Sequence, residues 1–162
     1  MKSWSERTRE VAYLLNPAFC GRLLYAAIRE YENKAKQAFP FPLVYLILPL
    51  VLHKQTRSRI SSRTQLLQWI QANQYLLVGY ARRTKELVVI TNEAIELLLQ
   101  SGMIQLTQSG GLCTAASKKS LSKTRFVDPE ISEYITKSEH VARWFASTGK
   151  VETIYISLGV RP

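Results

Sequence analysis

The sequence predicts a single domain over residues 1–162 that is mainly α-helical, with a small β-hairpin or sheet, in the α+β class. Residues 43–52 carry no charge and only the Tyr45 hydroxyl as a polar group, so other parts of the chain must enclose them. Apolar residues around this run recur at three- and four-residue spacing, which is typical of helices. With 162 residues, 46% of them hydrophobic, the chain can bury one ordinary core.

The first part of the domain, residues 1–60, is predicted to be helical. Residues 5–15 can form one helix, and Asn16-Pro17 then supplies an N-cap and a proline at the first position of the next. Pro42 suits the start of a core helix that runs to about Lys54, and Pro49 should kink or split it. This apolar run is about half the roughly 20 residues that a membrane-spanning helix needs, so we expect no membrane contact.

The second part, residues 61–162, follows a polar, basic connector at 54–63. A Gly-containing turn, Gln108-Ser109-Gly110-Gly111, separates two short apolar segments and predicts a β-hairpin. The elements are expected in the order helix 64–72, helix 74–87, helix 91–101 capped by Thr91 and ended by Gly102, strand 103–107 and strand 112–116. Helices followed by a glycine and a hairpin are the order of a winged helix-turn-helix.

The last third is predicted to close the fold with one helix and one strand. Asp128-Pro129-Glu130 places a cap, a proline and an acid in the order that begins a helix, and Gly149 would end it. Residues 151–158 alternate β-branched or aromatic residues with others, and this pattern predicts a short final strand that adds to the hairpin.

The formal charge of +10 is concentrated in the middle of the chain. Residues 54–125 contain eleven basic and three acidic side chains, a net of +8, and the remainder contains eleven basic and nine acidic, a net of +2. This imbalance favours nucleic acid as a partner, although a solvated basic face would give the same pattern. In the candidate recognition helix, Glu93 and Glu96 would face phosphates without an arginine to read guanine, so sequence-specific readout is not expected.

The residues needed for common catalytic centres do not occur together. Asp128 is the only aspartate, and His53 and His140 lie at no spacing typical of a zinc site or a catalytic triad. Cys20 and Cys113 are too few for a disulfide framework and are expected to be reduced, buried thiols. The sequence therefore predicts no enzyme activity and no cofactor, and the polar N-terminus predicts a cytoplasmic protein.

Several stretches of the chain resemble one family of bacterial proteins. They are Asn16-Pro17-Ala18-Phe19 before Leu23-Leu24, the proline-punctuated run 39–54, Thr91-Asn92-Glu93-Ala94, and Ala142-Arg143-Trp144-Phe145 through Gly159-Val160-Arg161-Pro162. The chain is similar to the middle components of three-component ABC ATPase systems, bacterial conflict systems that include the Lamassu type. The resemblance implies a kleisin-like adaptor between an SMC- or ABC-type ATPase and an effector, often a nuclease, in defence against phages or plasmids.

Combined with the basic middle of the chain, this resemblance predicts non-specific contact of the assembled complex with DNA. Two groups of residues are the candidate DNA- or partner-facing sites: His53, Lys54, Arg57, Arg59 and Arg63, and then Lys118, Lys119, Lys123 and Arg125. A winged-helix transcription regulator stays open as an alternative and would bind one DNA sequence as a homodimer. An enzyme stays open as well, and it would need His53 or His140 for turnover.

Overall fold

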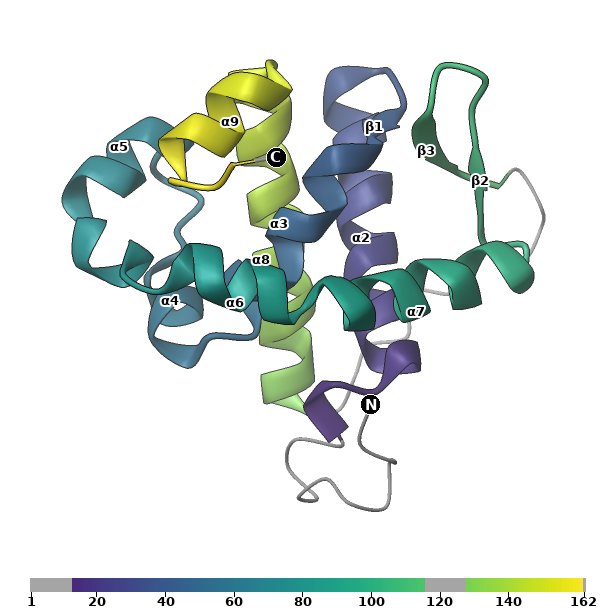
Figure 1. The fold of residues 1–162 in the computed structure, drawn as a ribbon, viewed down its shortest axis with the longest axis horizontal. Helices are drawn as coiled ribbons and strands as arrows, with labels where there is room; N and C mark the ends of the chain where they lie inside the picture. The colour runs from purple at the N-terminus through teal and green to yellow at the C-terminus, as the bar shows by residue number, and fades with distance from the viewer. Residues whose placement is uncertain (1–12, 116–127, 162) are drawn as a thin grey trace.

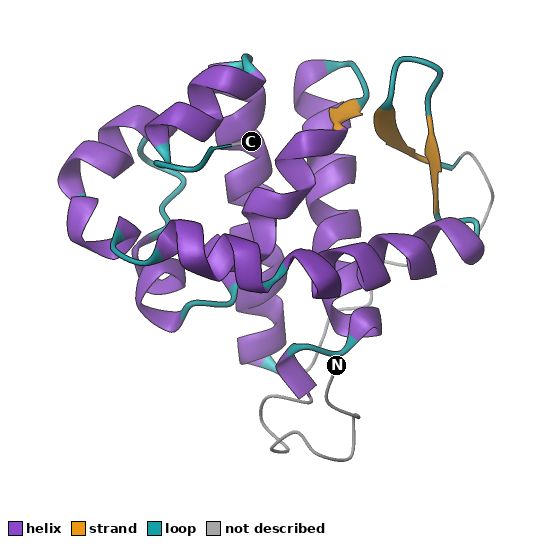
Figure 2. Ribbon diagram, viewed as in Figure 1, coloured by secondary structure: helices purple, strands orange, loops and turns teal. Residues whose placement is uncertain are grey.

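The computed structural model describes residues 13–115 and 128–161. Two long helices, α2 and α8, pack side by side at the centre, and α6 and α7 lie end to end across them (Figure 1). The elements are α2 (Pro17–Ala35), β1 (Phe39–Pro40), η2 (Phe41–Leu43), α3 (Val44–Val51), α4 (Lys54–Arg59), α5 (Leu66–Ala72), η3 (Gln74–Leu77), α6 (Tyr80–Glu86), α7 (Val88–Gln100), β2 (Ile104–Leu106), β3 (Gly111–Thr114), α8 (Pro129–Thr148) and α9 (Val151–Ser157). The prediction of a mainly helical domain with a small sheet is confirmed (Figure 2).

The two long helices begin where the capping residues predict. The Asn16 side chain accepts a hydrogen bond from the Ala18 amide at 2.8 Å, and Asp128 accepts one from the Glu130 amide at 2.8 Å. Each cap satisfies an amide that has no partner inside its helix, and the proline that follows has no amide to satisfy. Gly149 ends α8 with a φ of 84°, a conformation that glycine adopts without a Cβ penalty.

The apolar run forms the centre of the core, as predicted. Every residue of α3 except Tyr45 is buried, and helices α2, α6, α7 and α8 pack against α3. Pro49 lies inside the helix, which ends at Val51 and not near Lys54. The buried apolar residues of the described ranges form one cluster with contributions from both halves of the chain.

The sheet is antiparallel in the order β1-β3-β2. Phe39 pairs with Leu112, and Leu112 pairs with Leu106, so β3 is the central strand. The Glu32 carboxylate accepts hydrogen bonds from the Thr114 amide at 3.1 and 3.2 Å and from its hydroxyl at 2.7 Å, which attaches β3 to α2. The order of helices and hairpin is consistent with a winged helix, which stays a prediction.

The prediction of a final strand at 151–158 is wrong, because this segment is helix α9 and the third strand is β1. Ile154, Tyr155 and Leu158 all face the core, at the spacing of a helix and not of a strand. A segment of about eight residues is too short for an alternating pattern alone to distinguish a strand from a helix.

Three other boundaries differ from the sequence prediction. The connector 54–63 contains helix α4, and the predicted helix 74–87 is divided by Gly79, which has a φ of +75°. Helix α7 begins at Val88, so Thr91 is a buried residue inside the helix and not its cap. Of the predicted first helix, most lies outside the described residues.

Candidate nucleic-acid and partner interface

The basic strip is the name used here for Lys54, Arg59 and Arg63, which lie on α4 and the loop after it. All three side chains are exposed. These residues belong to the first group of sites predicted from the sequence, and His53 and Arg57 complete that group. The second predicted group, Lys118, Lys119, Lys123 and Arg125, lies outside the described residues.

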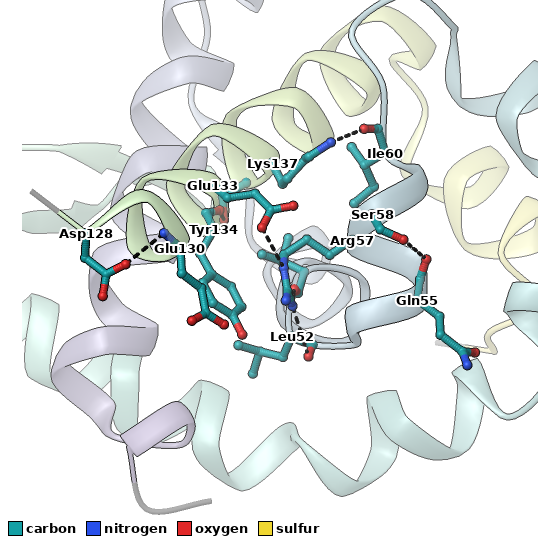
Figure 3. Close-up of polar contacts among 12 residues, drawn as sticks. Leu52, Gln55, Arg57, Ser58, Ile60, Asp128, Glu130, Glu133, Tyr134 and Lys137 are labelled. Carbon is teal, nitrogen blue, oxygen red and sulfur yellow. Dashed lines mark hydrogen bonds and ion pairs between the residues drawn. The ribbon is translucent and has the colours of Figure 1, made fainter. Parts of the chain in front are cut away.

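Arg57 does not belong to the exposed strip, because its side chain is only 4% exposed. Its guanidinium group donates to the Val51 carbonyl at 2.9 Å and lies over the Tyr134 ring, with Glu133 3.8 Å away (Figure 3). These contacts connect the end of α3 and helix α4 to α8. Arg57 is therefore a buried packing residue, and it is left out of the basic strip.

His53 is the N-cap of α4. Its Nδ1 atom lies 2.7 Å from the Thr56 hydroxyl and accepts from the Thr56 amide at 3.4 Å. Burial and the nearby charges of Arg83 and Arg57 lower the pKa of His53, which favours the neutral ring that can accept this hydrogen bond. The position of His53 is thus explained by helix capping.

The loop that carries Arg63 is fixed by side chains from α5 and α8. The indole of Trp69 donates to the Arg59 carbonyl at 2.8 Å, and the indole of Trp144 donates to the Thr64 carbonyl at 2.6 Å. The two indoles also pack together, with ring centroids 5.2 Å apart. Lys137 donates to the Ile60 carbonyl between them. Because its carbonyls are held, the loop can present Arg59 and Arg63 to solvent from a fixed backbone.

A small polar notch of about 150 Å³ is lined by Ser62 and Thr64, which flank Arg63 in the chain, and Lys34 and Arg143 are also among the residues that line it. Arg143 also pairs with Glu30 at 2.8 Å. Nothing in the sequence pattern brings Lys34 together with Ser62 and Thr64, since these residues belong to different elements that only the tertiary fold places around one notch.

Helix α7 occupies the position of the candidate recognition helix. It contains no lysine or arginine, and Asn92 and Glu96 are exposed. The Asn92 side chain already accepts a hydrogen bond from the Tyr45 hydroxyl at 2.8 Å. The helix therefore offers acidic and amide groups, which suit neither phosphates nor guanine.

Two apolar grooves flank helix α6, and sequence reasoning did not identify them. The first groove, of about 510 Å³, has apolar walls formed by Leu15, Pro49, Leu52, Leu87, Val89 and Ile90. The second, of about 390 Å³, is lined by Tyr45, Ala81, Thr84, Lys85, Val88, Tyr155, Val160 and Arg161. In the sequence, apolar residues of a buried core and apolar residues of a surface groove give the same pattern. Only the structure shows which of them border solvent.

The described residues were compared with the requirements of metal sites, reactive cysteines and membrane-spanning helices. Within residues 13–115 and 128–161, no three His, Cys, Asp or Glu side chains come together in a way that could hold a metal ion. Cys20 and Cys113 are free thiols, the first buried and the second half-buried, and burial raises the pKa of Cys20 to about 12. No helix in this part of the chain has the length and hydropathy to cross a membrane.

Comparison with known proteins gives one match. No curated protein and no solved structure matches the chain. Residues 4–162 match the family model of the ABC-three component (ABC-3C) system Middle Component 3. Because this match covers nearly the whole sequence, the chain belongs to the Middle Component 3 family of ABC-three component systems.

Proposed function

We propose that the protein is a non-enzymatic, kleisin-like adaptor that connects an SMC- or ABC-type ATPase to an effector such as a nuclease. Membership of a family of middle components carries this proposal, because a middle component of a multi-component system has partner subunits. A Lamassu-type system that acts against phages or plasmids is the setting we propose. Both histidines of the chain are half-buried, and the capping role of His53 accounts for its position without catalysis.

The DNA contact that we propose is non-specific and uses the basic strip. Lys54, Arg59 and Arg63 are exposed, and the Trp69 and Trp144 hydrogen bonds support a fixed arrangement of the loop. Three phosphate contacts would release counterions, so the logarithm of the affinity should fall with the logarithm of salt concentration with a slope near −2.7, taking about −0.9 per contact.

Co-purification tests the adaptor role. The tagged protein is purified with the products of its neighbouring genes, and the mass of the complex is measured with and without DNA and ATP. A stoichiometric complex with a large ATPase supports the adaptor. A lone protein that binds no other subunit contradicts it.

Charge reversal tests the DNA contact in the same complex. Arg59→Glu and Arg63→Glu should weaken DNA retention and flatten its salt dependence. Lys150→Glu is the matched control, because Lys150 is an exposed basic residue just before α9, outside both the strip and helix α6. If the three variants and the unchanged protein retain DNA equally, the basic strip does not take part in the DNA contact.

A winged-helix transcription regulator is the second candidate. The hairpin that follows α7 favours it, and the acidic character of α7 argues against it. Tight binding of one DNA sequence by the protein alone, with a loss of binding on replacement of Asn92, would support the regulator over the adaptor.

A further inference from the structure

Helix α6 lies between the two apolar grooves, and exposed apolar residues lie beyond both of its ends, the second of them in the first turn of α7. Val78, just before the helix, is 78% exposed, and Val89, just after it, is 49% exposed. Together with the grooves they form a surface that we name the α6 ridge. Figure 1 shows α6 and α7 on the face of the molecule nearest the viewer, in front of the central helices. Apolar surface of this kind is typical of a protein interface and is not covered by nucleic acid phosphates.

The charge of the ridge is positive. Arg82, Arg83 and Lys85 lie on α6, and Arg161 lines the second groove, whereas Glu86 is the acid of the helix. The Arg82–Glu86 ion pair, at 2.9 Å, offsets one positive charge. Lys85 and Arg161 both line the second groove, and both are exposed.

Arg83 has a second role that fixes the shape of the ridge. Its guanidinium group donates to the Leu76 and Val78 carbonyls, both at 3.2 Å, and so holds the turn that presents Val78. The Nε atom of Arg83 is buried and has no hydrogen-bond partner. Arg83 and Glu86 both line the first groove, so its apolar walls are bordered by one positive and one negative group.

We propose that the α6 ridge docks a segment of another subunit of the complex that combines apolar side chains with Asp or Glu. This inference rests on the proposed adaptor function and names the chemistry of one partner. The volumes of both grooves lie in the range of small-molecule pockets, about 300–1,000 Å³, so each has room for side chains of a docked segment. Carboxylates would meet Lys85 and Arg161, and apolar side chains would cover Val78 and Val89.

Charge also argues against a second copy of this chain as the occupant. A two-fold contact brings the same patch together from both copies, so the positive groups of α6 would face each other. Like charges across an interface disfavour such a pairing. An acidic partner removes this repulsion.

Site-specific photocrosslinking tests the proposal in the complex assembled from the products of the neighbouring genes. A benzophenone amino acid replaces Val78 or Val89, and the crosslinked peptides are identified by mass spectrometry. We expect both positions to crosslink to one region of another subunit that contains apolar residues and Asp or Glu. Leu106 on β2 is the control position, because it is 55% exposed and lies outside the ridge.

Charge reversal supplies a second measurement. Lys85→Glu combined with Arg161→Glu should weaken association with that subunit about tenfold or more, since close interfacial charge pairs contribute at least that much to binding. Arg59→Glu should leave this association unchanged while it weakens DNA retention. The two sets of variants thus separate partner docking from DNA contact.

Four results would overturn the proposal: crosslinks to a second copy, to residues 1–12 of the same chain or to DNA, or an intact complex without crosslinks from either valine. In each of these cases the adaptor function still stands, because the complex itself has formed. If no complex forms at all, the adaptor function and the docking proposal fail together.

Discussion

The guanidinium carbon of Arg57 lies 3.9 Å from the centroid of the Tyr134 ring. This cation–π contact joins α4, in the first half of the chain, to α8, near its end. The same guanidinium group donates to the Val51 and Leu52 carbonyls at 2.9 and 3.4 Å (Figure 3). These carbonyls lie at the C-terminal end of α3, where no later amide of the helix can donate to them. Arg57 therefore stabilises the position of the element that carries the basic strip.

Replacement of Arg57 should destabilise the fold, whereas replacement of Arg59 should not. Arg57→Ala removes the cation–π contact and leaves the two carbonyls without this donor, a loss of about 2–4 kcal/mol in the free energy of unfolding. Arg59→Ala changes an exposed side chain and should stay within about 0.5 kcal/mol of the unchanged protein. Urea unfolding followed by circular dichroism measures both. Equal free energies for the two variants would contradict the internal role of Arg57.

The burial of Arg57 could not be read from the sequence. Arg57 occurs among Lys54, Arg59 and Arg63 in a polar stretch, and such stretches are usually solvated. Arg57 differs from these three residues because its guanidinium group lies over the Tyr134 ring. Tyr134 is far along the chain, and no local sequence pattern links it to α4. The capping residues Asn16 and Asp128, by contrast, act on amides two positions away, so the beginnings of α2 and α8 could be predicted.

The link between Glu32 and Thr114 should stabilise the hairpin more than the rest of the fold. Glu32→Ala removes three hydrogen bonds to Thr114 and should cost about 1.5–3 kcal/mol, the range for hydrogen bonds to charged groups. Hydrogen exchange at the Leu112 and Cys113 amides should accelerate more than exchange in α8. Glu152→Ala, at an exposed position on α9, is the control and should change neither rate. Uniform acceleration in hairpin and α8 would mean that the link supports only global stability.

The sheet shows how non-local pairing limits prediction. The hairpin β2–β3 was predicted because its two strands are separated by a local turn. Strand β1 contains Pro40, which lacks an amide donor and indicates a loop when considered alone. Its pairing with Gly111 becomes visible only in the folded chain. The grooves beside α6 depend likewise on contacts among α3, α6, α7 and α9.

Two glycine replacements should have opposite effects on stability. At Gly111 an added Cβ would lie 2.8 Å from the Ala38 Cβ and 3.3 Å from the Phe39 carbonyl, so Gly111→Ala should push β1 and β3 apart at a cost of about 1–3 kcal/mol. At Gly21, inside α2, an added Cβ makes ordinary contacts of 3.5 Å with Leu98. Gly21→Ala should stabilise the protein by about 0.5–1 kcal/mol, because alanine favours helix. Thermal unfolding of both variants checks the pair, and a loss of stability in Gly21→Ala would contradict this account.

Acidification should destabilise the protein partly through His53. The pKa of His53 is lowered in the folded protein by burial and by the charges of Arg83 and Arg57, so the unfolded chain binds the proton more readily. The neutral His53 ring contributes fully to the stability of the fold above the pKa of histidine in the unfolded chain, about 6.5. This contribution is lost as the pH falls from there through the lower pKa of His53 in the folded protein. Protonated Nδ1 also cannot accept the Thr56 amide, and the α4 cap weakens.

Other groups titrate in the same range, so the test compares two proteins. The pKa of His140 is lowered by burial and by Arg143 and Lys137, while burial and Glu30 raise the pKa of Glu139. Asparagine is a good N-cap and does not titrate, so His53→Asn retains the cap while the contributions of His140 and Glu139 cancel in the difference. Between pH 7.5 and 5.5 the melting temperature should fall more in the unchanged protein than in His53→Asn. Parallel falls in the two proteins would show that His53 does not contribute to the acid sensitivity.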